Sequence, residues 1–434
     1  MAERVAITGA GAITPIGCGY EAFRDGLRAG CSAVKRITAF DASGLPTRIA
    51  AEIRDEADDL TRWVEPRKAT KLMSRAALFG VAAAAMARKH AGLDRGAVDP
   101  CRLAVVMGAG GMGPTDLDLL ATQAGAVIDA AQAGGSGGWD IPTFARLFAE
   151  RTNPVATLRG LPNLAAAHVA IQNDARGPNA TITTACCAGT QAIGEGLRLI
   201  QRGDADVVLA GGTDAGVNPV AVLGFSLLGT LSRRNEEPGR ASRPFDRARD
   251  GFVIGEGAGA VVLERQTFAE ARGARVLAEL AGYGVSCDAY RITDERPDAE
   301  GAARAIGLTL SDAELAPAEV EYVNAHGTGT PMNDITETRA LKLSLKAHAG
   351  KVPISSTKSM IGHLLAAAGA VELVAAVIAI REGFIPPTIN LDVADDECDL
   401  DYVPNVARTA APATALSTSF GFGGQNACLA IRRW

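Results

Sequence analysis

Long apolar runs are absent from this 434-residue sequence, and their absence argues against a membrane-spanning protein. The longest runs, such as 81–86 and 364–370, are rich in alanine and fall far short of the ~20 residues that a spanning helix needs. The N-terminal segment MAERVAIT lacks the features of a signal peptide, and the eight cysteines form neither a CxxC pair nor a regular framework. We therefore expect a cytoplasmic protein with free thiols and no membrane span.

An excess of positive charge is also lacking. The chain has 43 Lys and Arg residues against 49 Asp and Glu residues, which gives a net charge of −6. This balance argues against a protein whose whole surface binds nucleic acid or anionic lipid. With 47% hydrophobic and 21% charged residues, the composition also argues against a disordered, collagen-like or coiled-coil chain.

A complete dinucleotide-binding motif is missing as well. The segment Gly9 to Thr14 reads GAGAIT, which imitates the glycine-rich fingerprint but lacks its third glycine. No acidic residue stands at the required position after a second strand. We therefore reject an NAD-binding site here.

Short β-branched runs that end in glycine alternate with longer Ala/Leu-rich stretches, a pattern typical of an α/β protein with buried strands. The sequence predicts strands at 4–8, 103–107, 181–184, 206–210, 258–263, 275–282, 319–324, 352–355, 415–418 and 427–432. It predicts helices at 20–29, 69–90, 142–151, 190–202, 300–308, 334–345 and 363–381. The segments 123–139, 231–250 and 386–399 are expected to be irregular. Because the alternation starts again near Arg272, we expect one compact unit with two similar halves.

Two adjacent cysteines follow one of the predicted strands. The segment 183–190 reads TTACCAGT, and a helix is expected to begin near Gly189. A thiol at this point would face the helix N-terminus, where the macrodipole and free N–H groups lower its pKa and favour a thiolate nucleophile. Alternatively, Cys186 and Cys187 fill space in the core, because free cysteine is among the most buried residue types.

Two of the five histidines lie in glycine-flanked turns after apolar strands. They are His326 in VNAHGTGT and His363 in STKSMIGHLLAAAGA, and such positions face the cleft of an α/β fold. We expect both to be functional. His90 and His348 are expected to be exposed, and His168 to lie on a packed helix face.

Lys358 precedes His363 by five residues, so the two side chains could enter one pocket. A buried ammonium needs an anionic partner, and Asp334 or Glu337 at the start of a predicted helix could supply it. The alternative for Lys358 is an exposed position in a loop.

A glycine-rich segment, SFGFGGQN at 419–426, separates the last two predicted strands. Its glycines permit a backbone that aims N–H groups at an oxyanion, with a phenylalanine as a movable wall. A simple hairpin loop is the alternative.

The sequence resembles the β-ketoacyl-acyl-carrier-protein synthases, most of all the elongating type II enzymes of fatty acid synthesis. It shares with them, in order, the motifs TTACCAGT, DADVVLAGGTDA, SRPFDRARDGFVIGEGAGAVVLE, VNAHGTGTPMND, SSTKSMIGHLLAAAGAVE, PPTINLD and SFGFGGQN. The resemblance implies a homodimer with the thiolase-like αβαβα sandwich and duplicated halves. The N-terminal half, 1–268, would carry the nucleophile. The C-terminal half, 269–434, would carry the two histidines, the lysine and the gate loop.

The resemblance also implies roles for single residues. Cys186 matches the nucleophile, and Cys187 stands beside it as a bystander. His326 and His363 match the two active-site histidines, and Lys358 matches the lysine next to them.

Further positions match supporting residues of the family. Glu337 resembles the acidic residue that pairs with the lysine, and Thr328 and Thr330 match the threonines that hold the phosphopantetheine arm. Phe422 resembles the gating phenylalanine, whose N–H would form the oxyanion hole together with the N–H of Cys186.

The implied reaction transfers an acyl group from acyl carrier protein to Cys186, decarboxylates malonyl-acyl carrier protein and forms a 3-oxoacyl product two carbons longer. It requires no metal and no bound cofactor, because phosphopantetheine arrives on the carrier. Two alternatives stay open: a catalytic ketosynthase of a polyketide or specialised-lipid pathway, and a non-catalytic chain-length partner subunit. The second would lack a nucleophile such as Cys186.

Two positions depart from the family pattern, and a set of basic residues is a candidate surface for the acyl carrier protein. Gly111 stands where elongating synthases often have a bulky aliphatic residue, which predicts a roomier acyl pocket, and Thr418 replaces a common asparagine, which puts a structural cation in doubt. The carrier is acidic, so a local basic surface is expected, unless these charges only form a solvated face. Its candidate residues are Arg67, Lys68, Lys71, Arg75, Arg233 and Arg234.

Overall fold

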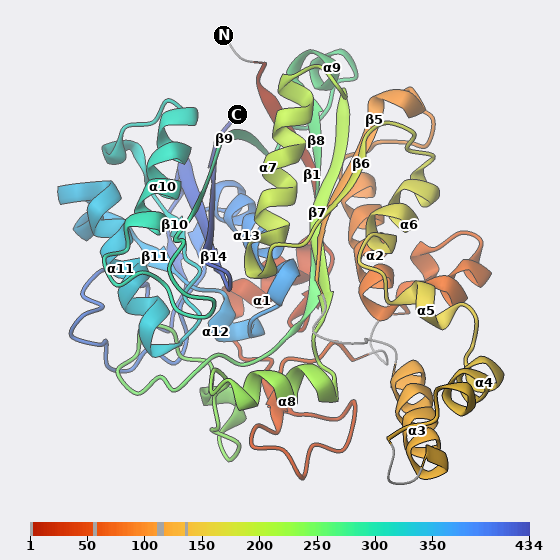
Figure 1. Cartoon of the computed structure of the whole chain (residues 1–434). Helices are drawn as coiled ribbons and strands as arrows, with labels where there is room; N and C mark the ends of the chain where they lie inside the picture. Colours follow the sequence, from red (N-terminus) through yellow and green to blue (C-terminus); the bar gives the residue numbers. More distant parts are fainter. Residues whose placement is uncertain (1–2, 55–58, 111–116, 135–137) are drawn as a thin grey trace.

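The computed structural model describes residues 3–54, 59–110, 117–134 and 138–434 (Figure 1). In this part of the chain an eleven-stranded sheet has the order β11-β10-β14-β15-β9-β1-β8-β7-β5-β6, with β2 (Gly17–Cys18) beside β1. The strands of the first half are β1 (Val5–Thr14), β5 (Leu103–Ala109), β6 (Asn179–Ile182), β7 (Val207–Ala215) and β8 (Glu256–Arg265). Those of the second half are β9 (Ala278–Cys287), β10 (Val323–Asn324), β11 (Ile354–Ser355), β14 (Thr414–Gly421) and β15 (Gln425–Arg432).

Apart from β2, the two halves of the sheet follow one plan. The five strands of each half can be numbered in chain order. From the outer edge of the sheet to its middle, both halves then have the order third, second, fourth, fifth and first. Strand β5 pairs in parallel with β6 and β7, and β10 pairs in parallel with β11 and β14. Strand β8 pairs antiparallel with β7 and β1, and β15 pairs antiparallel with β14 and β9. The shared order and directions confirm the duplicated halves that the sequence predicts, and β1 joins β9 over two residue pairs.

Helices form three layers around these strands. Helices α7 (Ala188–Gln201) and α13 (Ala368–Glu382) lie at the centre and contact each other and strands of both halves (Figure 1). Helix α2 (Arg75–His90) covers β1, β7 and β8, whereas α10 (Glu300–Asp312) covers β9 and β15, with α11 (Pro331–Leu345) beside it. Apart from Glu372, α13 is apolar on all sides as far as Ile380, which suits a helix buried between two layers of strands. The result is the αβαβα sandwich.

The glycines of the GAGAIT segment serve close packing. Gly9 and Gly11 lie in β1, where a Cβ atom would come within 2.1 Å of the Ala87 carbonyl oxygen and 2.2 Å of the Ala83 carbonyl oxygen on α2. No side chain fits between this strand and that helix. The segment is therefore a buried strand and not a phosphate-binding turn.

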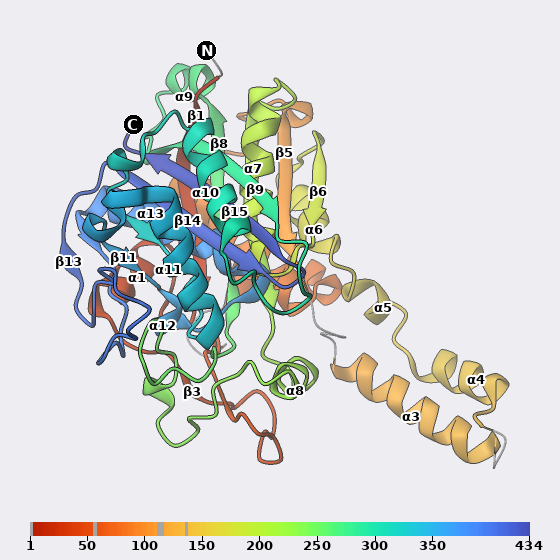
Figure 2. The same ribbon diagram turned by 60° about the vertical axis from the view of Figure 1, so that its left-hand side comes forward.

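Two helices form an arm that projects from the sandwich. Figure 2 shows α3 (Leu117–Gly134) and α4 (Ile141–Arg151) extending away from the layers. The prediction that 123–139 is irregular is wrong for 123–134, because α3 continues through Gly134. Its many alanines have the highest helix propensity, and this outweighs the glycines that suggested a loop.

The other helices are short or peripheral. They are α1 (Tyr20–Ala29), α5 (Ala156–Arg159), α6 (Leu164–Asn173), α8 (Pro219–Leu227), α9 (Gln266–Ala271) and α12 (Lys358–Ile361). Two small hairpins pair β3 (Lys35–Arg36) with β4 (Ile49–Ala50) and β12 (Phe384–Ile385) with β13 (Arg408–Thr409). The irregular character of 231–250 is confirmed, since its one helical turn is Pro238–Arg240. None of the helices in the described ranges has the length and apolar character needed to cross a membrane.

Three histidines have structural roles. His168 is buried on α6, and its Nε2 lies 3.2 Å from the Leu72 carbonyl oxygen, as expected for a packed helix face. His90 and His348 are partly buried and each contacts a backbone carbonyl through a ring nitrogen. The prediction that these two are exposed is wrong, because the rings pack against neighbouring segments, at Ala10 within β1 and at Val320 before β10.

Candidate active site

Cys186 lies in the turn between the end of β6 and the start of α7. A short 3₁₀ turn, Ala185–Cys187, joins the two elements. Ala185 has φ 49°, in the left-handed region that is costly for a residue with a Cβ atom. This turn holds the thiol at the N-terminal end of α7, where free N–H groups and the positive end of the macrodipole favour a developing negative charge.

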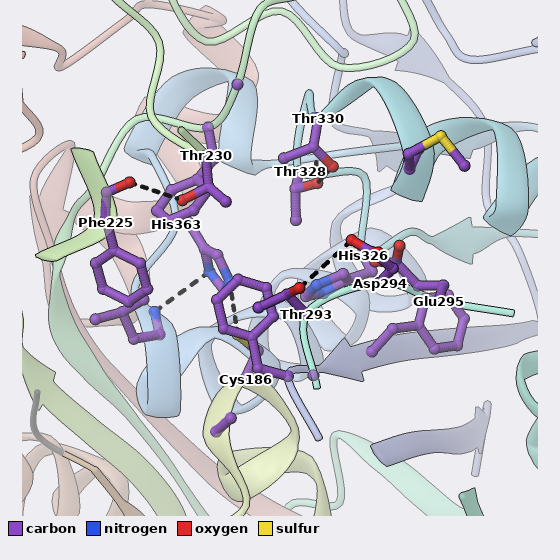
Figure 3. A pocket seen from close by; sticks show the side chains of 18 of the residues that line it. Cys186, Phe225, Thr230, Thr293, Asp294, Glu295, His326, Thr328, Thr330 and His363 are labelled. Carbon is purple, nitrogen blue, oxygen red and sulfur yellow. Dashed lines mark hydrogen bonds between the residues drawn. The ribbon is translucent and has the colours of Figure 1, made fainter. Parts of the chain in front are cut away.

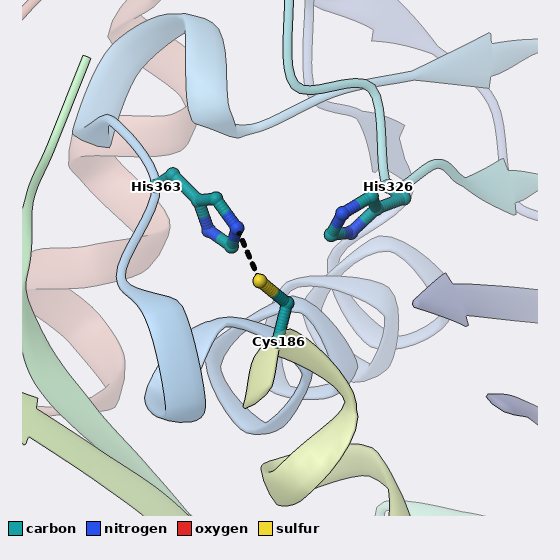
Figure 4. Close-up of side chains that lie close together, drawn as sticks. All are labelled: Cys186, His326 and His363. Carbon is teal, nitrogen blue, oxygen red and sulfur yellow. Dashed lines mark hydrogen bonds between the residues drawn. The ribbon is translucent and has the colours of Figure 1, made fainter. Parts of the chain in front are cut away.

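His363 occupies the matching position of the second half, between α12 and α13. Its backbone N–H donates to the Val253 carbonyl (2.7 Å), and its own carbonyl accepts from the Gly255 N–H (2.9 Å). The Leu365 N–H donates to Nδ1 (3.3 Å), so the ring proton resides on Nε2. Nε2 lies 2.9 Å from Cys186 Sγ (Figure 4).

His326 enters the same space just after β10. Lys358 Nζ lies 3.3 Å from its Nδ1, and because an ammonium has only donors, Nδ1 accepts and Nε2 carries the proton. The rings of His326 and His363 stand nearly perpendicular, at 85°, with centroids 5.3 Å apart. Figure 4 shows the thiol of Cys186 between the two rings. Two N–H donors therefore converge beside one sulfur atom.

The electrostatics keep both imidazoles neutral. Burial lowers the pKa of His326 and of His363 well below 6.5, and the positive charge of Lys358 lowers both further. The direction for Cys186 is opposite to the lowering expected from the helix N-terminus: burial raises the pKa of its thiol to about 12, while the charge of Lys358 opposes this rise. The resting site thus holds a thiol and two uncharged N–H donors.

Glu372, and not Glu337, pairs with the buried lysine. Lys358 Nζ donates to Glu372 Oε1 and to the His326 carbonyl oxygen (2.6 Å), and both charged side chains are about 1% exposed. The prediction that Asp334 or Glu337 supplies this partner is wrong. Glu372 lies on α13, and the fold brings this helix against the Lys358 segment.

Glu337 instead fixes the backbone around His326. Its carboxylate accepts from the N–H groups of His326 (2.8 Å) and Gly327 (2.7 Å) and from Thr418 Oγ1 (2.7 Å). Burial raises the pKa of Glu337 to about 7, and these hydrogen bonds oppose the rise. Thr418, the departure noted in the sequence, is thus part of the support of this turn.

Asp334 and Arg249 hold the next turn. Asp334 accepts from the N–H groups of Gly329 (3.1 Å) and Phe245 (2.6 Å). Arg249 lies 3.5 Å from Asp334 and donates to the carbonyl oxygens of Thr330 (3.2 Å) and Pro331 (2.8 Å). The segment 328–332 is therefore anchored from behind.

A cavity of about 470 Å³ opens over the thiol, and both halves of the chain line it (Figure 3). Cys186 and both histidines lie on its wall, together with Thr328, Thr330 and Phe420–Phe422. The hydroxyl oxygens of Thr328 and Thr330 are 2.9 Å apart. The two threonines can thus present hydroxyl groups to a polar arm that enters from this side.

The hairpin between β14 and β15 packs against the nucleophile. A Cβ atom on Gly421 would lie 3.3 Å from Cys186 N, so a glycine lets the hairpin approach the start of α7. The ring centroid of Phe422 lies 6.3 Å from that of Phe225, and both residues line the cavity. The predicted gate residue therefore borders the cavity that holds the thiol.

Three donor atoms of the site lie close enough to suit a metal ion. One ligand atom each from Cys186, His326 and His363 falls within 4.8 Å of the others. A metal-bound imidazole usually donates its second N–H to an acceptor. Here the second ring nitrogens face the N–H of Leu365 and the ammonium of Lys358, which are donors. With donors on these nitrogens, the protons of both rings lie on the nitrogens that face the thiol. This hydrogen-bond pattern argues against a metal site.

The remaining predicted site residues are the pocket residue Gly111 and the candidates for carrier docking. Gly111 lies outside the described residues, and its neighbour Gly110 lines the cavity. Arg75 is half-buried and pairs with Glu256 at 2.8 Å and with the Ile53 carbonyl oxygen, so its guanidinium is held within the chain. Arg234 donates to the Ala248 carbonyl.

The remaining docking candidates are exposed. Lys68, Lys71 and Arg233 lie at the surface, and Arg67 is exposed while it pairs with Asp59 at 2.7 Å. These four cations can face a partner.

Sequence reasoning missed three features of the site. Glu372 is the one carboxylate in the apolar run AGAVELVAAVIAI, and a lone charge in such a run signals a buried partner. Thr293–Glu295 lines the cavity from a loop without a recognisable motif, and Asp214 lines it from the end of β7. Burial raises the pKa of Asp214 to about 6.

Comparison with known proteins places the whole chain in one family. Residues 2–269 match the model of the β-ketoacyl synthase N-terminal domain, and 277–392 match that of the C-terminal domain. The chain is 43% identical to the 3-oxoacyl-[acyl-carrier-protein] synthase 2 of Synechocystis, over 100% of this chain and 98% of the relative. It is 41% identical to the ketoacyl synthase alpha subunit of the tetracenomycin polyketide synthase of Streptomyces glaucescens, over 99% and 97%.

A solved structure agrees with this placement. A type II polyketide ketosynthase bound to a hexaketide and in complex with its acyl-carrier protein aligns with a TM-score of 0.86 at 33% identity, covering 100% of both chains. The fold is thus that of the thiolase-like ketosynthases, as expected. With both domains matched and the thiol placed between two histidines, the chain belongs to the β-ketoacyl synthase family and is a condensing acyltransferase.

Proposed function

We propose that Cys186 is the nucleophile of a 3-oxoacyl-acyl-carrier-protein synthase that elongates fatty acids. Its Sγ attacks the thioester carbonyl of an acyl carrier protein, and the oxyanion that forms is stabilised by the N–H groups of Cys186 and Phe422. Collapse of this intermediate breaks the bond to the pantetheine sulfur, which leaves with the thiol proton. The main support is the 2.9 Å contact between Sγ and the N–H of His363, at the start of a helix.

In the second half-reaction His326 and His363 hold the thioester oxygen of malonyl-carrier with two N–H donors. The bond to the carboxylate breaks, CO₂ leaves, and the electron pair is held as an enolate whose oxygen accepts both hydrogen bonds. The enolate carbon attacks the acyl-Cys186 carbonyl and expels the thiolate, which gives a 3-oxoacyl-carrier two carbons longer. Neutral imidazoles suit this step, because imidazolium groups could protonate the reactive carbon.

Lys358 supports this chemistry without touching the substrate. Its charge disfavours protonation of the two histidines, and its contact with Nδ1 directs the His326 proton to Nε2. Glu372 neutralises the buried ammonium. Lys358 is therefore a positioning residue.

The substrate arm and the partners follow from the same proposal. Thr328 and Thr330 would hold the phosphopantetheine arm, which arrives on the carrier, so no bound cofactor is required. The exposed cations at 67, 68, 71 and 233 would attract the acidic carrier. We place the enzyme in the cytoplasm, where the thiol stays reduced.

We further propose that two copies pair through the arm. Among its described residues the arm exposes four large apolar side chains, and such a patch on a projecting element favours a partner surface. These side chains are Val127 (40% exposed), Ile128 (56%), Trp139 (50%) and Ile141 (65%).

A polyketide ketosynthase is the second candidate, because a relative of this kind is 41% identical over 99% of the chain. The intact mass of the protein after incubation with acyl-carrier thioesters of increasing chain length tests both. Acyl mass on the peptide that contains Cys186, discharged as 3-oxoacyl product by malonyl-carrier, supports the condensing role. Saturated chains as donors favour fatty acid elongation, and poly-3-oxo products favour the polyketide role. No acyl mass with any chain would overturn the proposal.

A further inference from the structure

Cys187 bridges the nucleophile turn to the hairpin that carries Phe422. Its side chain is fully buried, and its Sγ lies 3.1 Å from the Ser419 carbonyl oxygen and 3.1 Å from the Gln425 carbonyl oxygen. These two carbonyls belong to opposite strands of the β14–β15 hairpin, on either side of its turn. One thiol group thus reaches both sides of the base of the loop.

The hairpin lies close to the nucleophile turn and to the start of α7. A Cβ atom on Gly421 would lie 3.4 Å from Cys187 Sγ and 3.3 Å from both Cys186 N and the Thr184 carbonyl oxygen. One turn further along α7, Thr190 Oγ1 lies 2.7 Å from Ser419 Oγ. The first turn of α7 therefore meets the hairpin through two side chains as well as through the backbone.

The chemistry of the thiol suits a lasting hydrogen bond. Burial raises the pKa of Cys187 well above 9, so the group keeps its proton. A thiol is a weak donor, but a buried carbonyl that loses its donor costs more than the bond itself contributes. The S–H group has one proton, which it can give to either of the two carbonyls.

The position of this bridge gives it a consequence for catalysis. The oxyanion donors in the proposed function are the N–H of Cys186, which precedes Cys187, and the N–H of Phe422, on the loop whose base Cys187 contacts. We propose that Cys187 is a positioning residue that sets the spacing of these two donors by holding the hairpin base against α7. The inference rests on the assignment of Cys186 as nucleophile.

Three variants of the full chain test the proposal. Cys187→Ala removes the donor, Cys187→Ser keeps a hydroxyl donor on a shorter side chain, and Cys428→Ala is the matched control. Cys428 is equally buried, but its Sγ lies 3.7 Å from the Leu429 carbonyl oxygen and its side chain packs in the cluster that contains Ile306 and Leu310 of α10. Each protein is acylated with a ¹³C-carbonyl acyl group, and the infrared stretch of the thioester carbonyl reports how strongly the oxyanion hole polarises it.

For Cys187→Ala we expect the band at higher wavenumber, a kcat for condensation lower by about fivefold at unchanged KM for malonyl-carrier, and faster hydrolysis of the acyl-enzyme. Cys187→Ser should restore most of the band position and kcat, and Cys428→Ala should match the wild type. The proposal is overturned if Cys187→Ala keeps the wild-type band and kcat. It is also overturned if Cys187→Ser behaves like Cys187→Ala, or if Cys428→Ala shows the same losses, since the effect is then one of packing.

Two other outcomes are kept distinct. If Cys187→Ala does not fold, the comparison of Cys187→Ser with the wild type decides, because a donor with shorter reach should leave a small shift of the band to higher wavenumber and a bystander should leave none. If the wild type itself takes up no acyl group on Cys186, the proposed function fails, and the inference fails with it.

Discussion

The ammonium of Lys358 contacts His326 at two atoms, Nδ1 at 3.3 Å and the carbonyl oxygen at 2.6 Å. This pair of contacts fixes both the orientation of the residue and the tautomer of its ring. Since the His363 ring is fixed in the same sense by the Leu365 N–H, the two imidazoles present the same N–H edge to the cavity.

Lys358→Met should remove the contacts that fix the orientation and the tautomer of His326. We expect the pKa of His326 to rise yet stay below that of a free histidine, because burial is the larger cause of its lowering. The kcat for malonyl-carrier decarboxylation should fall by about 10²-fold. Carbon NMR of the five histidines, assigned by single substitutions, measures the pKa. The double variant Lys358→Met with Glu372→Leu controls for the unpaired carboxylate. A His326 that titrates as in the wild type would contradict the assigned role.

His326→Ala and His363→Ala should separate the two half-reactions. Both variants keep Cys186 and the N–H groups assigned to its oxyanion, so we expect acyl transfer to persist. Decarboxylation should fall by about 10²-fold or more, since each variant loses one of the two donors to the enolate oxygen. Acyl-enzyme mass and CO₂ release from malonyl-carrier are measured on the same samples. Equal loss of both activities would show that the histidines act in acylation instead.

Much of this site is readable from the sequence because its residues follow strands. Cys186, His326 and the Lys358 to His363 segment each come after a β-branched run, and α/β folds gather such positions at one edge. The partner of Lys358 does not follow from sequence position. Glu337 lies close in sequence to His326, whereas Glu372 reaches the lysine only because α13 packs between the two layers of strands.

The fold too is predicted in part from the sequence and decided in part by packing. The alternation of strands and helices predicts duplicated halves, and the identical strand orders confirm them. The sequence predicts a loop where the second part of α3 forms, because alanine favours a helix and glycine opposes one. Exposure of His90 also could not be read from its charged neighbours, since the ring packs on Tyr20 with centroids 4.4 Å apart.

The reactivity of Cys186 should depend on pH in a specific direction. Burial raises its thiol pKa to about 12, so the thiolate fraction increases tenfold with each pH unit across the neutral range. We expect the rate of alkylation by iodoacetamide to rise steadily from pH 7 to pH 10 without a plateau. Peptide mass analysis isolates this site from the other cysteines. A plateau below pH 9 would mean that the helix N-terminus and His363 outweigh burial.

The Lys358 and Glu372 pair should be costly to break. Both side chains are buried, and removal of one charge leaves the other without a partner in the core. We expect Glu372→Gln to lower the free energy of unfolding in urea by about 3–5 kcal/mol. Glu236→Gln, which removes a carboxylate that pairs with Arg36 at the surface, should leave it nearly unchanged. A small effect of Glu372→Gln would indicate that the amide replaces the carboxylate as an acceptor for the ammonium.

The projecting arm should control the oligomeric state. Ile128 and Ile141 expose 56% and 65% of their surface on α3 and α4, and an ion pair between Arg151 and Asp129 (2.8 Å) ties the two helices together. A charge in the apolar patch should therefore weaken pairing of two copies without unfolding the arm, because an interface excludes an unpaired carboxylate.

We expect Ile128→Asp with Ile141→Asp to shift the protein from dimer to monomer in sedimentation velocity, with an unchanged circular dichroism spectrum. Leu308→Asp is the matched control, since Leu308 is 47% exposed on α10, on the other side of the sandwich from the arm. It should leave the sedimentation coefficient as in the wild type. If the arm variant sediments like the wild type, the apolar patch binds something other than a second copy. If Leu308→Asp dissociates the dimer instead, the interface lies on the α10 face.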